Sequence, residues 1–350
     1  MKLIAAILLP VALALNAAGQ STNRLQPLLT NQVATSTHTP FANGECQECH
    51  QSKDPKQPGP VIRAGNALCV ECHEDFQATL ARKFRHAGGT NLCVTCHNPH
   101  NSKEAKLLLD YSTTLCGSCH EKVQQLASTL PVRHGALTQG RQCVGCHDPH
   151  AADFEHLLRR PTQAVCLECH DRNNVVDHTE KKLTNLKKWF EENPRAHGTI
   201  GSDCNACHEP HASAHFRLLR QPYPAELYVP FSTNAYALCF ECHEERAFTE
   251  PETETATQFR DGKRNLHFLH VNRAGPGRAC RLCHETHSSK REALMREGIP
   301  YEDSGWVLRP DFAKTANGGA CGQSCHSAQT YQNRASAPAA PSPKPQEPPP

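Results

Sequence analysis

Twenty cysteines dominate the chemistry open to this 350-residue chain, and all of them fall into ten close pairs. Nine pairs have the spacing C-x-x-C, and the tenth contains one extra residue. The pairs are Cys46/Cys49, Cys69/Cys72, Cys93/Cys96, Cys116/Cys119, Cys143/Cys146, Cys166/Cys169, Cys204/Cys207, Cys239/Cys242, Cys280/Cys283 and Cys321/Cys325. A histidine directly follows every pair: His50, His73, His97, His120, His147, His170, His208, His243, His284 and His326.

The pattern C-x-x-C-H is typical of covalent haem c attachment. Two thiols bond to the two vinyl groups of one haem, and the adjacent histidine binds the iron from one face. A zinc ribbon takes four ligands from two knuckles and needs no histidine after each pair, and a thioredoxin-like site is a single motif. The sequence therefore predicts ten covalently attached haem c groups. At Cys321/Cys325 the extra residue either loops out or leaves one thioether bond.

Thirteen further histidines supply candidates for the opposite face of each iron. Four lie three residues after a proximal histidine: His100, His150, His211 and His287. Five lie seven to ten residues before a pair: His38, His86, His134, His197 and His270. The tenth ligand is open among His267, His178, His156 and His215. Ligation by two histidines gives low-spin haems that suit electron transfer and bind substrates poorly, so we predict no catalytic residue.

The motifs repeat as five two-haem units, at about residues 38–80, 81–130, 131–190, 191–260 and 261–334, which we call repeats 1 to 5. Together they predict one decahaem domain over residues 38–334. Repeat 1 has Lys53 where repeats 2 to 5 have the histidine three residues after the motif. This difference leaves the ligand set of repeat 1 open.

Apolar residues at helical spacing separate the repeats. Phe76, Leu80 and Phe84 form one such stripe, Val123, Leu126 and Leu130 form a second, and a third runs through 176–192. Only 38% of the residues are apolar, against the usual 45–50%, so a large side-chain core is not expected. We therefore predict a mainly α fold with much irregular coil and little β, in which stacked haems form the core.

The two ends of the chain differ from the repeats. Lys2, the apolar run at 3–15 and the small residues Ala17, Ala18 and Gly19 predict a signal peptide over residues 1–19; a membrane anchor is the competing interpretation. Residues 20–37 read as a linker, and the proline-rich residues 335–350 as a disordered tail. We expect an exported protein of the periplasm or outer membrane, with an extracellular position as the alternative.

The run His–…–CxxCHxPH–…–LL–…–LCxxCH, as at 86–120, resembles the doubled-CXXCH multihaem c-type cytochromes, a branch of the cytochrome c3-like class. The resemblance covers nearly all of the chain after residue 37. In haem number and size the chain is also similar to the periplasmic decahaem cytochromes of porin–cytochrome conduits. The resemblance implies electron transfer, with other redox proteins as partners and an outer-membrane porin as a further candidate.

Two other functions stay open. A multihaem reductase of nitrogen or sulfur oxyanions needs one iron with an open face, and repeat 1 is the only foothold for it. A subunit of an extracellular cytochrome filament is the third interpretation. Nucleic acid is not expected as a partner, because 37 basic residues balance 35 acidic ones, and no small-molecule substrate is expected.

Overall fold

The computed structural model describes residues 33–87, 92–177, 179–198, 203–273, 275, 277–300, 304–322 and 324–333. They belong to two compact units, Met1–Ala64 with Val94–Asp110 and Gly65–Cys93 with Tyr111–Pro350. The predicted signal peptide, most of the linker and the proline-rich tail lie outside the described residues. Among the described helices, none has the length and apolar character that a membrane crossing requires.

The first unit contains few elements. They are β1 (Ser36–Thr37), α1 (Thr39–Ala42), the 3-10 helix η1 (Cys46–Glu48), β3 (Asn101–Ser102) and η3 (Ala105–Leu107). Strands β1 and β3 pair antiparallel, with Thr37 opposite Asn101. A short 3-10 helix, η2 (Cys93–Thr95), begins at Cys93, which belongs to the second unit, and its other two residues belong to the first unit.

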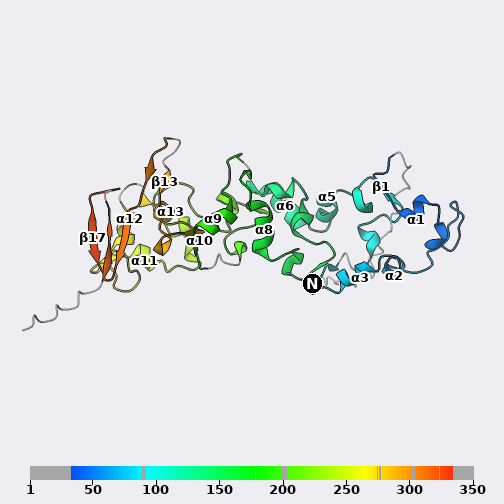
Figure 1. Ribbon diagram of the computed structural model, residues 1–350, viewed down its shortest axis with the longest axis horizontal. Helices are drawn as coiled ribbons and strands as arrows, with labels where there is room; N and C mark the ends of the chain where they lie inside the picture. Colours follow the sequence, from blue (N-terminus) through cyan, green and yellow to red (C-terminus); the bar gives the residue numbers. More distant parts are fainter. Residues whose placement is uncertain are drawn as a thin grey trace, which may run out of the picture. The chain divides into compact units, whose positions relative to one another are not determined.

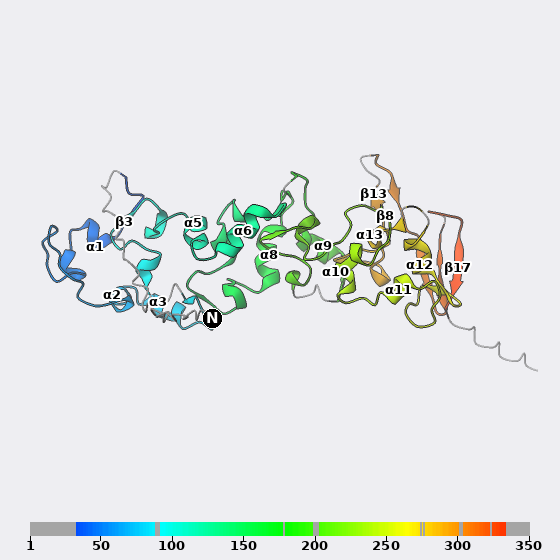
Figure 2. The ribbon, with the colours of Figure 1, turned by 180° about the vertical axis from the view of Figure 1, so that it is seen from behind.

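Helices in the second unit are short, and the longest have nine residues. They are α2 (Asn66–Val70), α3 (Asp75–Leu80), α5 (Ser112–Gly117), α6 (Glu121–Thr129), α7 (Cys143–Cys146), α8 (Thr162–His170), α9 (Leu186–Glu192), α10 (Ala237–Phe240), α11 (Arg246–Thr249), α12 (Leu266–Val271) and α13 (Cys280–Cys283). The 3-10 helices are η4 (Gly135–Leu137), η5 (Glu155–Leu157), η6 (Cys204–Ala206), η7 (Phe216–Leu218), η8 (Asn234–Tyr236) and η9 (Glu292–Leu294). Helix α6 lies beside α5 and α8 in both ribbon views (Figures 1 and 2).

Strands in the second unit are shorter still but numerous. Three two-residue pairs join distant segments: β2 (Phe84–Arg85) with β5 (Ala151–Ala152), β4 (Val132–Arg133) with β7 (Ala212–Ser213), and β6 (Arg195–Ala196) with β12 (Ser288–Ser289). Three more are β8 (Tyr228–Val229) with β11 (Gly277–Arg278), β9 (Arg260–Asp261) with β10 (Arg264–Asn265), and β13 (Ile299–Pro300) with β14 (Val307–Leu308). One sheet has three strands, β15 (Phe312–Thr315), β16 (Gly318–Cys321) and β17 (Gln329–Gln332).

The prediction of a mainly α fold with little β is wrong. Helices take up 34% of the described residues and strands 19%, divided among many small sheets. Most strands have two residues, which is too short to show the alternation by which a sequence reveals a strand. Their partners lie 64 to 94 residues away in the pairs that join repeats, so no local signal marks them.

The predicted helical stripes are only partly helical. Phe76 and Leu80 lie in α3, but Phe84 lies in β2. Helix α6 contains Val123 and Leu126 and ends just before Leu130. The third stripe shortens to α9, whose Trp189 Nε1–H donates to the Ser288 carbonyl at 3.2 Å. These helices end early because the chain turns into the strand that precedes each patterned histidine.

Buried side chains are few and mostly small. The residues of β3, β5, β7 and β12 are Asn, Ser or Ala, and each is at most 5% exposed. Small side chains let the paired backbones pack closely against neighbouring turns. One apolar cluster, Leu282 with Ile299 and Leu308, lies in repeat 5. This distribution fits the low apolar content of the sequence.

Candidate haem sites

We number the ten cysteine pairs, each with its adjoining histidine, as sites 1 to 10 in chain order. Both cysteines of a pair belong to one helical turn at most sites. In α7, at site 5, the His147 N–H donates to the Cys143 carbonyl at 3.0 Å. The equivalent bond measures 2.8–3.1 Å at sites 1, 2, 4, 7, 8 and 9. Residues three apart share a helical face, so this turn presents both thiols to one side.

The second cysteine often lies just beyond the helix. The motifs themselves are therefore less helical than the mainly α prediction implies. The helix contains both cysteines at sites 5, 6 and 9. At sites 1 to 4, 7 and 8 it ends before the second cysteine, which lies in the following turn: Cys49, Cys72, Cys96, Cys119, Cys207 and Cys242. The last turn tightens there, since the second cysteine's N–H donates to the carbonyl of the first at 3.2–3.3 Å at sites 1, 2, 4, 7 and 8. The helix ends early because the adjoining histidine must turn away from its axis.

These second cysteines are also less enclosed than a haem core predicts. Cys72, Cys119 and Cys242 are exposed on the polypeptide, and Cys49 and Cys96 are half-buried. All twenty cysteines lie within the described residues and outside any disulfide, so both thiols of each pair are available to a haem. Their attachment through thioether bonds stays a prediction.

Site 10 is built differently. Cys321 is the last residue of β16, and the N–H of Gly322 donates to the Asp311 carbonyl at 2.6 Å. A Cβ at Gly322 would lie 2.1 Å from an Asp311 carboxylate oxygen, so glycine is required there. The extra residue of this motif therefore accompanies a strand in place of the usual helical turn.

At sites 1, 5 and 7, the histidine that faces the proximal one comes from the next repeat. The ring of His100 stacks on His50 at 6.1 Å between centroids, with 10° between the planes. His211 faces His147 at 6.1 Å and 21°, and His287 faces His208 at 6.1 Å and 18°. The strand pairs between repeats produce this arrangement, because β3, β7 and β12 directly follow these three histidines.

At sites 4, 6 and 8, the facing histidine comes from the same repeat. His86 faces His120 at 5.8 Å, His134 faces His170 at 6.2 Å, and His197 faces His243 at 5.9 Å. Each of the three sits directly after the strand β2, β4 or β6. Its backbone N–H donates to the carbonyl of a histidine in the next repeat, at 2.9, 3.0 and 2.9 Å. The same strand pair therefore positions one histidine for an odd site and one for an even site.

Repeat 5 obtains its facing histidines in a different way. Helix α12 carries both His267 and His270. The ring of His267 lies 6.5 Å from His284 at site 9, and that of His270 lies 6.5 Å from His326 at site 10. Among the three open candidates that the structure describes, His156, His215 and His267, only His267 meets a proximal histidine.

The spacing of these rings fits an iron held between them. Metal–nitrogen bonds of about 2 Å place the centroids of two opposed imidazoles about 6 Å apart. All eight measured separations lie between 5.8 and 6.5 Å. With a thiol pair beside each proximal histidine, the residues present would tether and ligate a haem.

Hydrogen bonds orient one ring nitrogen of most of these histidines. The proximal Nδ1–H donates to a carbonyl nine residues downstream at 2.7–3.0 Å, in His50, His97, His147, His208 and His284. His38, His134 and His270 donate to Pro99, Pro210 and Leu266 at 3.0, 2.8 and 2.6 Å. Metal-binding histidines commonly donate this N–H to a carbonyl, which leaves Nε2 for the metal.

An unusual turn supplies four of the proximal carbonyls. Two consecutive residues adopt left-handed backbone angles, with φ between 52° and 60°, in each of four turns: Lys106–Leu107, His156–Leu157, Arg217–Leu218 and Ala293–Leu294. Site 1 uses Gly59, also at positive φ, in place of such a pair. Bulky residues rarely adopt this conformation. The second residue of each of these four turns is a leucine, and the contacts around the turn hold it in this strained backbone conformation.

Burial keeps the more enclosed histidines neutral. It lowers the pKa of His267 to about 4, with a smaller effect from the nearby His284. It likewise lowers the pKa of His287 to about 4, and His208 adds to this. A neutral imidazole keeps the lone pair that a metal needs.

Thiols of successive sites lie next to one another. Hydrogen bonds join Cys116 to Cys143, Cys166 to Cys204 and Cys239 to Cys280. The bond from Cys116 lowers the pKa of Cys143 to about 6. The second cysteines Cys146, Cys207 and Cys283 instead interact with Cys169, Cys239 and Cys325, which raise their pKa after the larger effect of burial. Neighbouring thiols thus connect sites 4 to 10 in sequence order.

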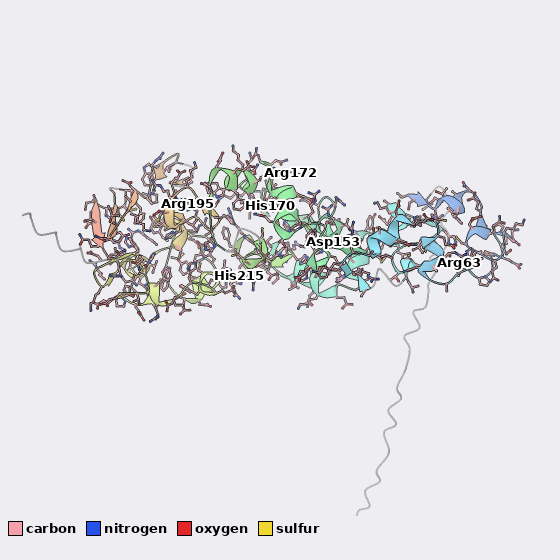
Figure 3. All side chains as sticks on the ribbon, turned by 60° about the horizontal axis from the view of Figure 1, so that its bottom comes forward. Arg63, Asp153, His170, Arg172, Arg195 and His215 are labelled. Atoms are coloured by element: carbon pink, nitrogen blue, oxygen red, sulfur yellow. The ribbon has the colours of Figure 1, made fainter. Side chains whose placement is uncertain are left out.

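The other candidate histidines have different surroundings. His156 is exposed, and its carbonyl accepts the His147 Nδ1–H at 2.7 Å. The backbone N–H of His215 donates to Ser213 Oγ at 2.8 Å; His215 and His170 are both labelled in Figure 3. His178 lies outside the described residues. The ring of His150 lies 4.7 Å from that of Phe76 and 3.6 Å from a carboxylate oxygen of Asp148.

Sequence reasoning missed which repeat each histidine serves. The signal was present: Lys53 replaces the histidine in repeat 1, which has no repeat before it to serve. The downstream carbonyls and Thr257, whose Oγ1 hydrogen-bonds to His267 Nδ1 at 2.9 Å, had no sequence signal.

The sequence of this chain matches a known protein family. A family model described as "Doubled CXXCH motif" matches residues 38–78, 86–125, 134–175 and 197–248, together half of the chain. The four matches begin at His38, His86, His134 and His197, the patterned histidines that open repeats 1 to 4. No curated protein matches the chain.

Proposed function

The chain belongs to the doubled CXXCH family of multihaem c-type cytochromes, and on that premise we propose that it is an electron-transfer protein with ten covalently bound haems. Haem held between two imidazoles supplies one-electron chemistry with no open coordination position. The chain's own residues tether each group through thiols, orient the imidazoles and set the local charge.

The facing histidine pairs carry this proposal. We assign His100, His211, His287 and His267 as distal ligands at sites 1, 5, 7 and 9. We assign His86, His134, His197 and His270 at sites 4, 6, 8 and 10. At each of these sites the two rings lie 5.8–6.5 Å apart, which supports iron bound on both faces.

Neighbouring thiols support transfer along a chain of haems. The first cysteine of sites 5, 7 and 9 lies against the first cysteine of the preceding site, which belongs to the repeat before. Since the thioether edges of successive haems would lie at these contacts, electrons would pass from site to site in sequence order. This order is proposed for sites 4 to 10.

Haem content tests the proposal most simply. The mature, exported protein should give ten haems by pyridine haemochrome assay and by intact mass. Its thiols should be unreactive toward alkylating reagents, because all of them are in thioether bonds; one reactive thiol would indicate single attachment at site 10. Fewer haems than sites, or bound zinc, would contradict the proposal.

A reductase is the alternative function. His100 beside His50 supplies a second ligand candidate at site 1, which argues against an open iron at that site. Turnover of nitrite or sulfite by the reduced protein, at a rate above that of free haem, would favour the reductase. Polymers seen by electron microscopy of the purified protein would favour a filament subunit.

Location and partners follow from the sequence. We propose that residues 1–19 direct export and that the mature protein works in the periplasm or at the outer membrane. Its partners would be other redox proteins, with an outer-membrane porin as a structural partner. Cell fractionation with a haem stain, in strains with and without the segment 1–19, tests the location.

A further inference from the structure

Two arginines from different repeats meet at one aromatic ring in the second unit. The guanidinium of Arg217 lies 5.1 Å from the centre of the Phe216 ring, and that of Arg281 lies 5.6 Å from it. A phenyl face attracts a cation, but two cations beside one ring also repel each other. This arrangement needs a negative charge that the ring does not supply.

Arg281 is half-buried and Arg217 is more exposed, and neither guanidinium forms an ion pair with a carboxylate of the described residues, in contrast to two other arginines. Arg159 meets Glu168 at 2.7 Å, and Arg296 meets Glu285 at 3.2 Å. Burial lowers the pKa of Arg217, Arg281 lowers it further, and the more distant Asp177 opposes them. The two cations are therefore partly removed from water without full compensation.

A buried hydroxyl adds a third donor. Tyr223 Oη has no hydrogen-bond partner among the described residues. It lies close enough to Arg281 and to the thiols of sites 8 and 9 for all three to affect its pKa, which burial raises most. The Nη1–H of Arg281 donates to the Ala225 carbonyl at 2.7 Å, which holds that guanidinium near the segment that carries Tyr223. The cluster is rich in donors and poor in acceptors.

The cluster adjoins the proposed haem sites. The backbone carbonyl of Arg217 accepts a hydrogen bond from the Nδ1–H of His208 at 3.0 Å, so Arg217 is held beside site 7. Arg281 lies between the two cysteines of site 9 in α13. A haem brings carboxylates of its own, and guanidinium forks bind carboxylates with two hydrogen bonds.

We propose that Arg217, Arg281 and Tyr223 form a binding site for a haem propionate between sites 7 and 9, an inference that rests on the proposed haem content. The two positive charges then raise the reduction potential of that haem, because they favour the state with one more electron. They also keep the propionate ionised in both oxidation states, so the potential is independent of pH near neutrality.

The test uses the full-length holoprotein and redox titrations followed by optical and electron paramagnetic resonance spectra. Arg217→Gln and Arg281→Gln each remove one charge. Arg217→Lys keeps the charge, and Lys187→Gln removes an exposed charge on α9 as the matched control. Titrations at about pH 6 and about pH 8 bracket the range in which a weakly held propionate would take up a proton. Each variant is first checked for ten haems and wholly low-spin iron, so loss of the proposed function is recognised separately.

In either glutamine variant, we expect the reduction potential of one haem in ten to be lower than in the wild type. The potential of that haem should also fall as the pH rises. Arg217→Lys should shift less, and Lys187→Gln should leave the titration unchanged. Unchanged potentials in both glutamine variants would overturn the proposal. So would a shift without pH dependence, since it would mean charge near an iron but no propionate contact. A wild-type potential that depends on phosphate concentration would assign the site to a free anion and also overturn it.

Discussion

Repeats 1, 3 and 4 differ from repeat 5 in where the facing histidine of their odd site comes from. In the former, His100, His211 and His287 arrive from the following repeat through a two-residue strand pair. In repeat 5, α12 places His267 and His270 three residues apart, one for each site. Only the segments of repeats 1 to 4 match the family model, so the difference is visible in the sequence comparison too.

The comparison teaches how an array of repeats can begin and end. A borrowed ligand links repeats 1, 3 and 4 to the repeat that follows each of them, whereas repeat 5 supplies the facing histidines of both its own sites. Terminal repeats of an array are commonly atypical for this reason. Lys53 in repeat 1 and His267 in repeat 5 are the two departures from the repeat pattern.

Removing a whole attachment site should have the largest effect. Cys204→Ala with Cys207→Ala would lose the haem at site 7 and destabilise both repeats that contribute to it, because metal-site binding energy is also folding energy, here on the order of several kcal/mol. Circular dichroism and proteolysis should show lost structure in repeats 4 and 5. The variant Cys321→Ala at site 10 serves as the control, and it should keep its haem through a thioether bond to Cys325. Equal damage from both changes would contradict the idea of a linking site.

Loss of one facing histidine should have a smaller, site-specific effect. His287→Ala should give one high-spin haem at site 7 in repeat 4, whereas His267→Ala should give one at site 9 in its own repeat. Electron paramagnetic resonance measures the high-spin fraction. Adding the Cys204/Cys207 substitutions to His287→Ala should remove that signal; a signal that survives would place His287 at another site.

Hydrogen bonds to a ligand should matter less than the ligand. Thr257→Val removes the partner of His267 Nδ1, and such outer partners are typically worth roughly 10–100-fold in metal affinity. Without this bond the imidazole donates less to the iron, so the potential of one haem should rise slightly. Redox titration tests it, with Thr129→Val, whose hydroxyl bonds only within α6, as control. A fall in potential would contradict the assigned role.

The smallest effect is expected at the beginning of the chain. Lys53→His restores the repeat pattern but has no preceding repeat to serve. The variant should keep the wild-type haem count, spin state and midpoint potentials. A new low-spin species, seen as an altered electron paramagnetic resonance spectrum, would show that a histidine at position 53 can displace a native ligand.

Much of the haem chemistry was readable from the sequence, because C-x-x-C-H is a local signal. The facing partners were not, since His100 and His50 are 50 residues apart and meet through strands too short to predict. His267 could not be told from His156 or His215 by spacing alone. The arginines at Phe216 carry no motif at all, and only the fold brings Arg217 near Arg281.

Quantitative electron paramagnetic resonance of the fully oxidised, haem-counted protein tests the central claim most directly. Iron between two imidazoles at every site predicts that all spins are low-spin and that their number equals the haem count. A high-spin ferric signal equal to one haem or more per chain would contradict it.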